Sequence, residues 1–291
     1  MFFQSGGRSI MKAMIFAAGL GTRLKPLTDT MPKALVPLAG KSLLQWQVEQ
    51  LRAAGITDII VNVHHFPDMI IEAIRANNGW GCNISISDER DQLLDTGGGL
   101  KKIHNSYPRR GTIISQFTMQ KEAVLACNVD ILSNIDIKAL VAQYERTGVS
   151  QLVVSERETQ RYLLFDENDT LRGWTNIATG EVRPNGSDQV TKYQVTKYQE
   201  PRQSEFRKLA FSGMQILSPD VLDRLQEMKE DKFSLIDFYV RLCENNHQSP
   251  ITNPQLVLKA YIPQNYQMMD VGKINQIEEA ALFAEKIQKK L

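Results

Sequence analysis

The stretch AMIFAAGLGTRL, residues 13–24, carries the strongest structural signal in the chain. Residues 13–17 form an uninterrupted apolar run, which predicts a buried β-strand. Gly19 and Gly21 then stand two residues apart. Because glycine tolerates a positive φ, the backbone can turn sharply here and point several N–H groups at one anion. The stretch therefore predicts a strand that ends in an anion-binding turn.

Two common glycine-rich motifs do not describe this turn. The dinucleotide fingerprint GxGxxG requires a third glycine where Leu24 stands. A P-loop is not met either, because residues 40–42 read Gly-Lys-Ser but Leu35 occupies the place of the leading glycine. The sequence therefore disfavours both an NAD-dependent oxidoreductase and a P-loop NTPase.

Small side chains and cations accompany the turn. Ala17 and Ala18 allow a flat group to approach the backbone. Arg23 lies inside the turn, and Lys33 follows ten residues later, after a segment stiffened by two prolines. We expect both cations to face one phosphate group.

Composition excludes several classes of protein. The 291 residues include 34 Lys or Arg and 33 Asp or Glu, a formal charge of +1, which offers no general attraction to nucleic acid or to a membrane surface. The sequence has no apolar run of about 18 residues that could form a membrane helix, no secretory signal at its start, and no zinc pattern among its cysteines. We expect a cytoplasmic protein with no nucleic-acid or membrane partner.

Strands and helices alternate over the first half of the chain. The patterns predict strands at 13–17, 58–63, 83–87 and 123–127, and helices at 42–54, 67–77 and 135–144. Such alternation implies crossover connections and a sheet covered on both faces. The expected fold class is α/β: a Rossmann-like mixed, mostly parallel sheet with helices on both faces, plus a strand-rich part.

The second half begins with short strands over 152–175 and continues through the polar stretch 176–208, where VTKYQ occurs twice in tandem. After this stretch, the apolar patterns predict strands at 209–217 and 256–262, and helices at 219–228, 234–245 and 274–290. We expect a disordered leader at 1–10 and a single domain at 11–291, divided into halves at 11–150 and 151–291, the second of which includes the C-terminal helix.

Two aspartates stand where apolar runs end. Asp130 comes just after a predicted parallel strand, at the sheet edge where ligands bind in open α/β folds. Asp270 ends another apolar stretch, before the last helix. Two such carboxylates can hold a Mg²⁺ ion that takes phosphate oxygens as further ligands. Taken singly, each is more often a helix cap or turn residue.

A second glycine cluster, DTGGG, occupies residues 95–99. Three consecutive glycines weaken the start of a helix. We interpret them as a place where the backbone lies close against a flat group such as a base, with a plain loop as the alternative.

Together these motifs resemble the sugar-1-phosphate nucleotidylyltransferases. The resemblance rests on FAAGLGTRLKPLTDTMPKALVPLAGKSLL, NVHHF, DTGGGL, the strand before Asp130, FSG and MDVG, which occur in family order over residues 11–291. The TGGG form points to the branch that contains N-acetylmuramate-1-phosphate uridylyltransferase and mannose-1-phosphate guanylyltransferase.

The resemblance implies that 11–150 is the nucleotide-binding half and that 151–291 is the sugar-binding half with the C-terminal helix. It also implies roles for individual residues. Catalytic residues would be Arg23, Lys33, Asp130 and Asp270, the last two also holding Mg²⁺. Nucleotide-binding residues would be Ala17, Ala18, Gly19, Gly21, Thr22, Thr96, Gly97 and Gly98, and sugar-binding residues would be Ser212, Gly213 and Glu200. The chain departs from the family at Val129, where glycine is usual, and after Glu200, where a lysine is missing.

The activity implied is transfer of a nucleotidyl group from UTP or GTP to a sugar 1-phosphate, with release of pyrophosphate, in sugar nucleotide biosynthesis for the cell envelope. The alternative is a module of the same fold that senses nucleotides or sugar nucleotides without catalysis. A related cytidylyltransferase would share the first motif but would not need Asp270. The base, the sugar and the choice between monomer and dimer stay open at this point.

Overall fold

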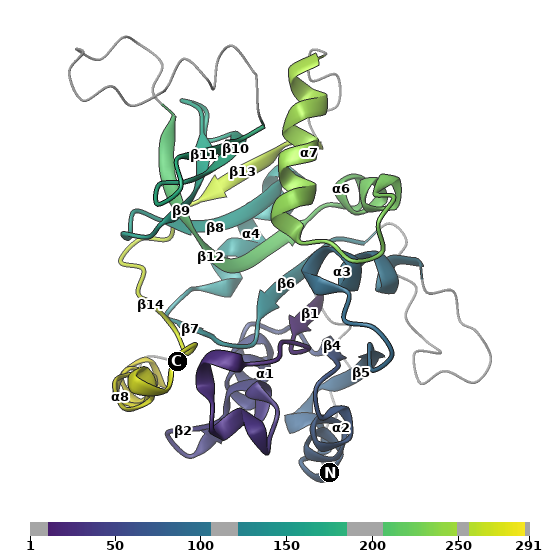
Figure 1. Cartoon of the computed structure of the whole chain (residues 1–291), viewed down its shortest axis with the longest axis vertical. Coiled ribbons are helices and arrows are strands. Elements are labelled where there is room, and N and C mark those ends of the chain that lie inside the picture. Colours follow the sequence, from purple (N-terminus) through teal and green to yellow (C-terminus); the bar gives the residue numbers. More distant parts are fainter. Residues whose placement is uncertain (1–10, 106–121, 185–205, 249–255, 289–291) are drawn as a thin grey trace, which may run out of the picture.

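The computed structural model describes residues 11–105, 122–184, 206–248 and 256–288 (Figure 1). Its strands are β1 (Lys12–Phe16), β2 (Pro37–Leu38), β3 (Lys41–Ser42), β4 (Asp58–Val63), β5 (Asn83–Asp88), β6 (Val124–Asn128), β7 (Ile131–Ser133), β8 (Ser150–Ser155), β9 (Arg161–Phe165), β10 (Leu171–Asn176), β11 (Glu181–Arg183), β12 (Arg207–Leu217), β13 (Leu258–Tyr261) and β14 (Met268–Asp270). The α-helices are α1 (Leu43–Ala53), α2 (Pro67–Ala76), α3 (Asp95–Asn105), α4 (Ile137–Thr147), α6 (Pro219–Arg224), α7 (Leu235–Gln248) and α8 (Ile277–Gln288). The expected leader, 1–10, and the tandem VTKYQ lie outside the described residues.

The first strand is central to a ten-stranded sheet with the order β11-β10-β9-β12-β6-β1-β4-β5, to which β8 and β13 add beside β12. β1 pairs in parallel with β4 on one side and with β6 on the other, and β4 pairs in parallel with β5. All five residues of β1 except the first are buried. A continuous apolar run is what a parallel strand covered on both faces requires.

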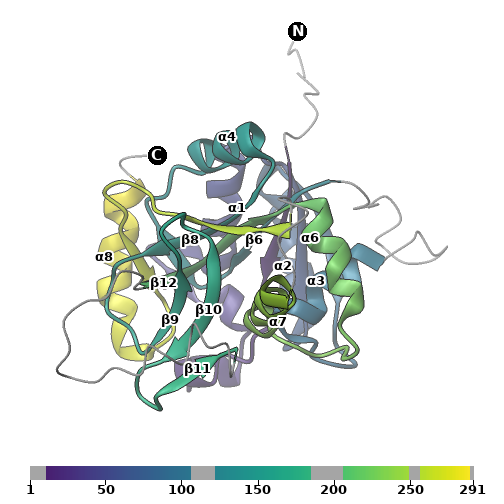
Figure 2. The ribbon, with the colours of Figure 1, turned by 90° about the horizontal axis from the view of Figure 1, so that it is seen from above.

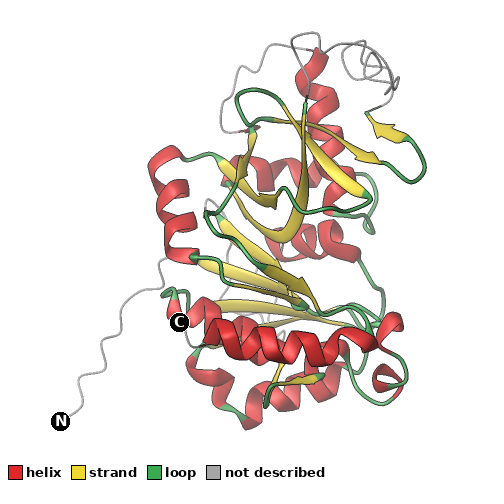
Figure 3. Ribbon diagram, turned by 90° about the vertical axis from the view of Figure 1, so that its left-hand side faces the viewer, coloured by secondary structure: helices red, strands yellow, loops and turns green. Residues whose placement is uncertain are grey.

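Alternate residues of β1 enter two separate cores. Ala13 and Ile15 pack in one core with side chains from α1, α2, α4 and α8, whereas Met14 and Phe16 pack in the other with α3, α6 and α7. The second group of helices lies together on one side of the sheet in Figure 2, away from α4 and α8. Figure 3 shows the strands between the two helical layers. Side chains of a strand alternate between its faces, so one short segment holds both layers together.

β12 joins the two halves of the chain. It pairs antiparallel with β6, β8 and β9, and β9–β11 continue as an antiparallel meander, whereas β8 and β13 are parallel. The predicted α/β class is confirmed: the sheet is mixed, it is parallel from β6 to β5, and helices cover both faces. The strand-rich part is mostly antiparallel.

Most predicted elements are found within a few residues of their expected bounds. The helix predicted at 219–228 is divided, because α6 ends at Arg224 and a 3₁₀ turn, Leu225–Glu227, follows. The last helix likewise starts with a 3₁₀ turn, Ile274–Gln276, before α8. Helix ends commonly tighten in this way, and sequence periodicity does not detect it.

A serine cap stabilises the start of α1. Ser42 is the N-cap, and its hydroxyl oxygen accepts a hydrogen bond from the Gln45 N–H at 3.1 Å. Ser42→Ala should lower the free energy of unfolding by about 1 kcal/mol in urea titrations, because one N–H loses its partner. Ser42→Asp, which keeps an acceptor there, should stay close to the wild type. Equal loss in both variants would contradict the capping role.

Candidate active site

The glycine-rich turn is held in place by its own contacts. Gly21 adopts a φ of 64°, and its carbonyl accepts hydrogen bonds from the Leu24 N–H at 2.8 Å and the Thr28 hydroxyl at 2.9 Å. A Cβ on Gly21 would lie 2.8 Å from the Thr28 methyl carbon and 3.0 Å from the Lys33 Cβ. Both the conformation and the lack of space therefore require glycine here. The same contacts fix the turn relative to Lys33.

A buried asparagine, which the sequence analysis missed, orients the beginning of the turn. The Asn62 Oδ1 atom accepts hydrogen bonds from the Ala17 N–H at 2.7 Å and the Ala18 N–H at 3.3 Å. Its Nδ2 donates to the Glu89 carboxylate at 2.9 Å. Burial raises the pKa of Glu89, although the bonds from Asn62 and the Leu94 N–H oppose this. The signal available in the sequence was a polar residue near the end of the apolar strand DIIVNV.

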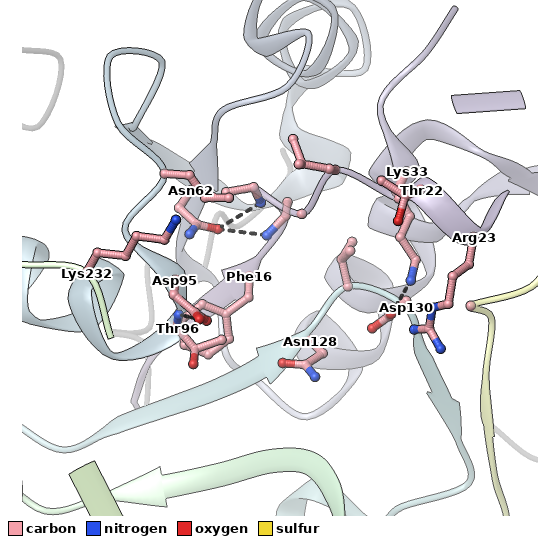
Figure 4. Close-up of a pocket in the computed structure, with 18 residues that line it drawn as sticks. Phe16, Thr22, Arg23, Lys33, Asn62, Asp95, Thr96, Asn128, Asp130 and Lys232 are labelled. Atoms are coloured by element: carbon pink, nitrogen blue, oxygen red, sulfur yellow. Dashed lines mark hydrogen bonds and ion pairs between the residues drawn. The ribbon is translucent and has the colours of Figure 1, made fainter. Parts of the chain in front are cut away.

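The turn forms one wall of a cavity of about 510 Å³ (Figure 4). Residues 16–23 line it, together with Lys33, Asn62, Thr96, Asp130 and Lys232. Val129, which replaces the usual glycine of the family, is buried and also lines the cavity. Predicted nucleotide-binding residues of the turn thus share one cavity with two predicted catalytic residues from later segments.

Backbone pairing brings the two predicted acids together. β7 and β14 form a small antiparallel sheet in which Asp270 stands opposite Ile131. The Val271 N–H donates to the carbonyl of Asp130 at 2.8 Å. Burial raises the pKa of Asp270, and the neighbouring charge of Asp130 raises it further, whereas Lys33 and Arg23 act in the opposite direction. The site therefore concentrates negative charge that a cation would neutralise.

The two predicted cations lie beside these acids. Lys33 is almost fully buried and forms an ion pair with Asp130. A Cβ on Gly272 would lie 3.0 Å from a terminal nitrogen of Arg23 and 2.7 Å from a carboxylate oxygen of Asp270. Arg23, Lys33 and Asp130 gather at one end of the cavity in Figure 4. The structure thus unites the four residues that were expected to be catalytic.

The second glycine cluster needs a different explanation from the one expected. Thr96 lines the cavity, but Gly97 and Gly98, expected to lie against a base, are not among its lining residues. A Cβ on Gly97 would lie 2.3 Å from the ring of Phe233, and one on Gly98 would lie 2.1 Å from the carbonyl oxygen of Asp231. The flat group that requires glycine at position 97 is therefore a phenylalanine of the protein itself.

The residues expected to bind the sugar are only partly located. Ser212 is fully buried in β12, and Gly213 takes a φ of 69°. A Cβ on Gly213 would lie 3.0 Å from the Asn128 Nδ2 and the Ile131 Cγ1. Gly213 thus lets β12 pass close to the strand end that carries Asp130. Glu200 lies outside the described residues.

Comparison with known proteins agrees with this arrangement. The family described as "Nucleotidyl transferase" matches residues 12–287, nearly the whole chain. The chain belongs to this family. The resemblance noted in the sequence is thereby confirmed. Within the described residues, no helix is both long and apolar enough to cross a membrane.

Curated relatives in the family include two N-acetylmuramate alpha-1-phosphate uridylyltransferases. The one from Caulobacter vibrioides is 50% identical over 91 residues, 31% of this chain and 38% of the relative. The one from Neisseria meningitidis is 38% identical over 129 residues, 44% of this chain and 51% of the relative. A mannose-1-phosphate guanyltransferase from Schizosaccharomyces pombe is 43% identical over 88 residues, 30% of this chain and 24% of the relative. The chain thus spans about half or less of the length of these relatives.

Solved structures share the fold over almost the whole chain. HddC from Yersinia pseudotuberculosis, solved in complex with GMP-PN, matches with a TM-score of 0.62 and 20% identity, over 94% of this chain and 99% of that one. A UDP-glucose pyrophosphorylase in complex with UDP-glucose gives a TM-score of 0.64 and 18% identity, over 97% and 100% of the two chains. At these identities the likeness concerns the fold.

The role of Asn62 can be tested directly. Asn62→Ala removes the acceptor of two buried N–H groups and a donor to Glu89, so unfolding should cost about 3 kcal/mol less than in the wild type. Chemical denaturation measures this change. Asn83→Ala is the matched control, because Asn83 donates to Asp58 at 3.0 Å on the exposed surface, and it should change stability by less than about 0.5 kcal/mol. A similar loss in both variants would contradict the structural role of Asn62.

Proposed function

We propose that the protein transfers a nucleotidyl group from UTP or GTP to a sugar 1-phosphate and releases pyrophosphate. One observation carries the proposal: Arg23, Lys33, Asp130 and Asp270 come from separate parts of the chain and lie together beside the cavity of the glycine-rich turn. The printed names of the relatives, uridylyltransferase and guanyltransferase, support this reaction class. We place the reaction in sugar nucleotide biosynthesis for the cell envelope, in the cytoplasm, within one domain of residues 11–291.

The chemistry needs alignment and charge neutralisation rather than a general base. A sugar 1-phosphate is already ionised at pH 7, so its oxygen can attack the α-phosphate without losing a proton to the protein. The backbone N–H groups of residues 19–22 and the Arg23 guanidinium bind the β- and γ-phosphates. Lys33, buried at the base of the turn, neutralises charge at the reacting phosphate. In-line attack in a preorganised site then lowers the barrier.

The two acids fit a magnesium ion. Within the described residues, no group of three or more His, Cys, Asp and Glu side chains could hold a metal, but Mg²⁺ commonly uses one or two carboxylates plus water and substrate phosphates. Asp130 and Asp270 supply such a pair. Burial and the neighbouring charge of Asp130 both raise the pKa of Asp270, and a bound cation would oppose both effects. When bound, Mg²⁺ would polarise phosphate oxygens and stabilise the leaving pyrophosphate.

The remaining assignments extend the family resemblance to the base and the sugar. Ala17, Ala18 and Thr96 line the cavity away from the acids and are proposed to contact the nucleoside. Gly97 and Gly98 would shape that wall through the segment that packs on them. The sugar is proposed to lie along Ser212 and Gly213, next to the strand end of Asp130, with Glu200 as a further contact.

One assay tests the proposal. The purified protein is incubated with each of the four NTPs and a panel of sugar 1-phosphates, and pyrophosphate is measured with and without Mg²⁺. We expect magnesium-dependent release with a uridine or guanosine triphosphate. Tight nucleotide binding in calorimetry with no pyrophosphate from any pair would instead favour the sensing module.

The acids can be tested separately. Asp130→Ala and Asp270→Ala should each abolish magnesium-dependent pyrophosphate release, because each change removes one of the two carboxylates that place the ion at the reacting phosphates. Unfolding curves should show that both variants are folded. Asp68→Ala, which breaks a surface ion pair with Arg90, is the control and should turn over normally. Normal turnover by both site variants would refute the metal assignment.

Lys33 should act on the chemical step. Lys33→Ala should lower kcat by about 10²- to 10³-fold and change the KM for the nucleotide far less, because the charge is needed mainly when the α-phosphate reacts. Steady-state kinetics measure the two constants. Lys41→Ala is the matched control, since Lys41 is also ion-paired, with Glu49 at 2.6 Å, but lies outside the cavity. An effect on KM alone would place Lys33 at a phosphate that does not react.

A further inference from the structure

Residues 231–235, which lead into α7, are hydrogen-bonded to the start of α3. The N–H groups of Gly97 and Gly98 both donate to the Phe233 carbonyl, at 3.0 and 3.2 Å. The Phe233 N–H donates to the Leu94 carbonyl at 3.2 Å, and the Leu235 N–H donates to the Thr96 hydroxyl oxygen at 3.0 Å. Close contact is possible because neither glycine carries a Cβ. The DTGGG motif is therefore a docking platform for residues 231–235.

A lysine of α3 holds the other end of the same segment. The Lys101 ammonium donates to the Met228 carbonyl at 2.9 Å and to the Glu230 carbonyl at 3.2 Å. It also contacts the Asp231 carboxylate at 3.2 Å. The backbone on both sides of residue 232 is thus restrained. Such restraint is unusual for an exposed connection, which ordinarily needs only to link two helices.

This segment presents Lys232 to the cavity. Figure 4 shows the Lys232 side chain extending toward Asn62, on the wall that faces the beginning of the turn. Among the residues that the structure describes, the Lys232 ammonium has no hydrogen-bond or ion-pair partner. An ammonium group has three donors and no acceptor. Lys232, an exposed residue, therefore lines the cavity with a cation that pairs with none of the described residues.

The place of Lys232 separates it from the phosphate site. Arg23, Lys33 and Asp130 lie at one end of the cavity in Figure 4, and Lys232 lies at the other. A nucleoside triphosphate whose phosphates occupy the first end extends its base toward the second. Lys232 then faces the edge of the base that is farthest from the ribose. That edge carries O4 in uracil and O6 in guanine, but an amino group in cytosine and adenine.

The polar groups around Lys232 leave few alternatives for reading this edge. The side-chain amide of Asn62 is already engaged on both sides, with two backbone N–H groups and with Glu89. The Asp95 carboxylate also lines the cavity and can accept a further N–H, while one of its oxygens receives the Thr96 N–H at 2.6 Å. An ammonium and a carboxylate together complement a carbonyl beside a ring N–H, as in uracil and guanine.

We propose that Lys232 is a specificity-determining residue that selects bases with a carbonyl on their distal edge, by donating a hydrogen bond to uracil O4 or guanine O6. The inference rests on the proposed function for the orientation of the nucleotide. An amino group in the same place turns its own donors toward the ammonium, so no hydrogen bond forms between the two donors. The glycine platform matters because a fixed backbone limits the positions that the Lys232 ammonium can reach.

Binding measurements test this without requiring turnover. Calorimetry with UTP, CTP, GTP and ATP in the presence of MgCl₂ compares bases that differ at the distal edge, UTP against CTP and GTP against ATP. The wild type should bind the carbonyl member of at least one pair about 10- to 100-fold more tightly, as a charged hydrogen bond provides. Lys232→Met, which keeps the length and removes the charge, should lose this preference by weakening the carbonyl member. Lys229→Met, on the same exposed segment, is the control and should bind as the wild type does.

Three results would overturn the proposal: no preference in the wild type, an unchanged preference in Lys232→Met, or an equal loss for all four nucleotides, which would indicate a phosphate contact. Failure of the proposed function is distinguishable, because pyrophosphate release would then be absent with every sugar 1-phosphate while base selectivity in binding could still be present.

Discussion

Two carboxylates, Asp130 and Asp270, are held side by side by the pairing of β7 with β14. Burial raises the pKa of Asp270, and repulsion from the neighbouring charge of Asp130 raises it further. The fold tolerates the arrangement because Lys33 pairs with Asp130 and the Arg23 guanidinium lies beside Asp270. The glycine-rich turn, the cations and the acids thus form one electrostatic unit. In the proposed function, a phosphate-bearing substrate and a cation would complete the balance of charge.

The turn itself is preorganised by contacts within the protein. Asn62 fixes the first N–H groups, and the contacts of Gly21 fix the turn against Thr28 and Lys33. Donors that are already oriented need little reorganisation when an anion arrives. This arrangement requires a buried Glu89 carboxylate, and burial raises its pKa. Hydrogen bonds from Asn62 and the Leu94 N–H stabilise the charged carboxylate and oppose that rise. The binding site therefore depends on a layer of polar contacts beneath it.

The halves of the chain are joined at the site rather than at a separate interface. β12 pairs with β6, so Gly213 passes within contact distance of Asn128 at the strand end before Asp130. The segment 231–235 docks on the start of α3 and brings Lys232 to the cavity of the glycine-rich turn. Residues of the second half therefore shape the cavity from two directions. A change in either connection would therefore alter the shape of the cavity.

The sequence by itself determined the α/β class, most element bounds and the identity of the turn, because apolar periodicity and glycine spacing are local properties of the chain. It also predicted Arg23, Lys33, Asp130 and Asp270 as site residues, since cations and metal-binding carboxylates suit phosphate chemistry. Only the tertiary structure decided that β7 and β14 unite the acids, that Asn62 supports the turn, and that Gly97 makes room for Phe233. These contacts join residues far apart in the chain, and a pairing between distant segments depends on how the whole core packs.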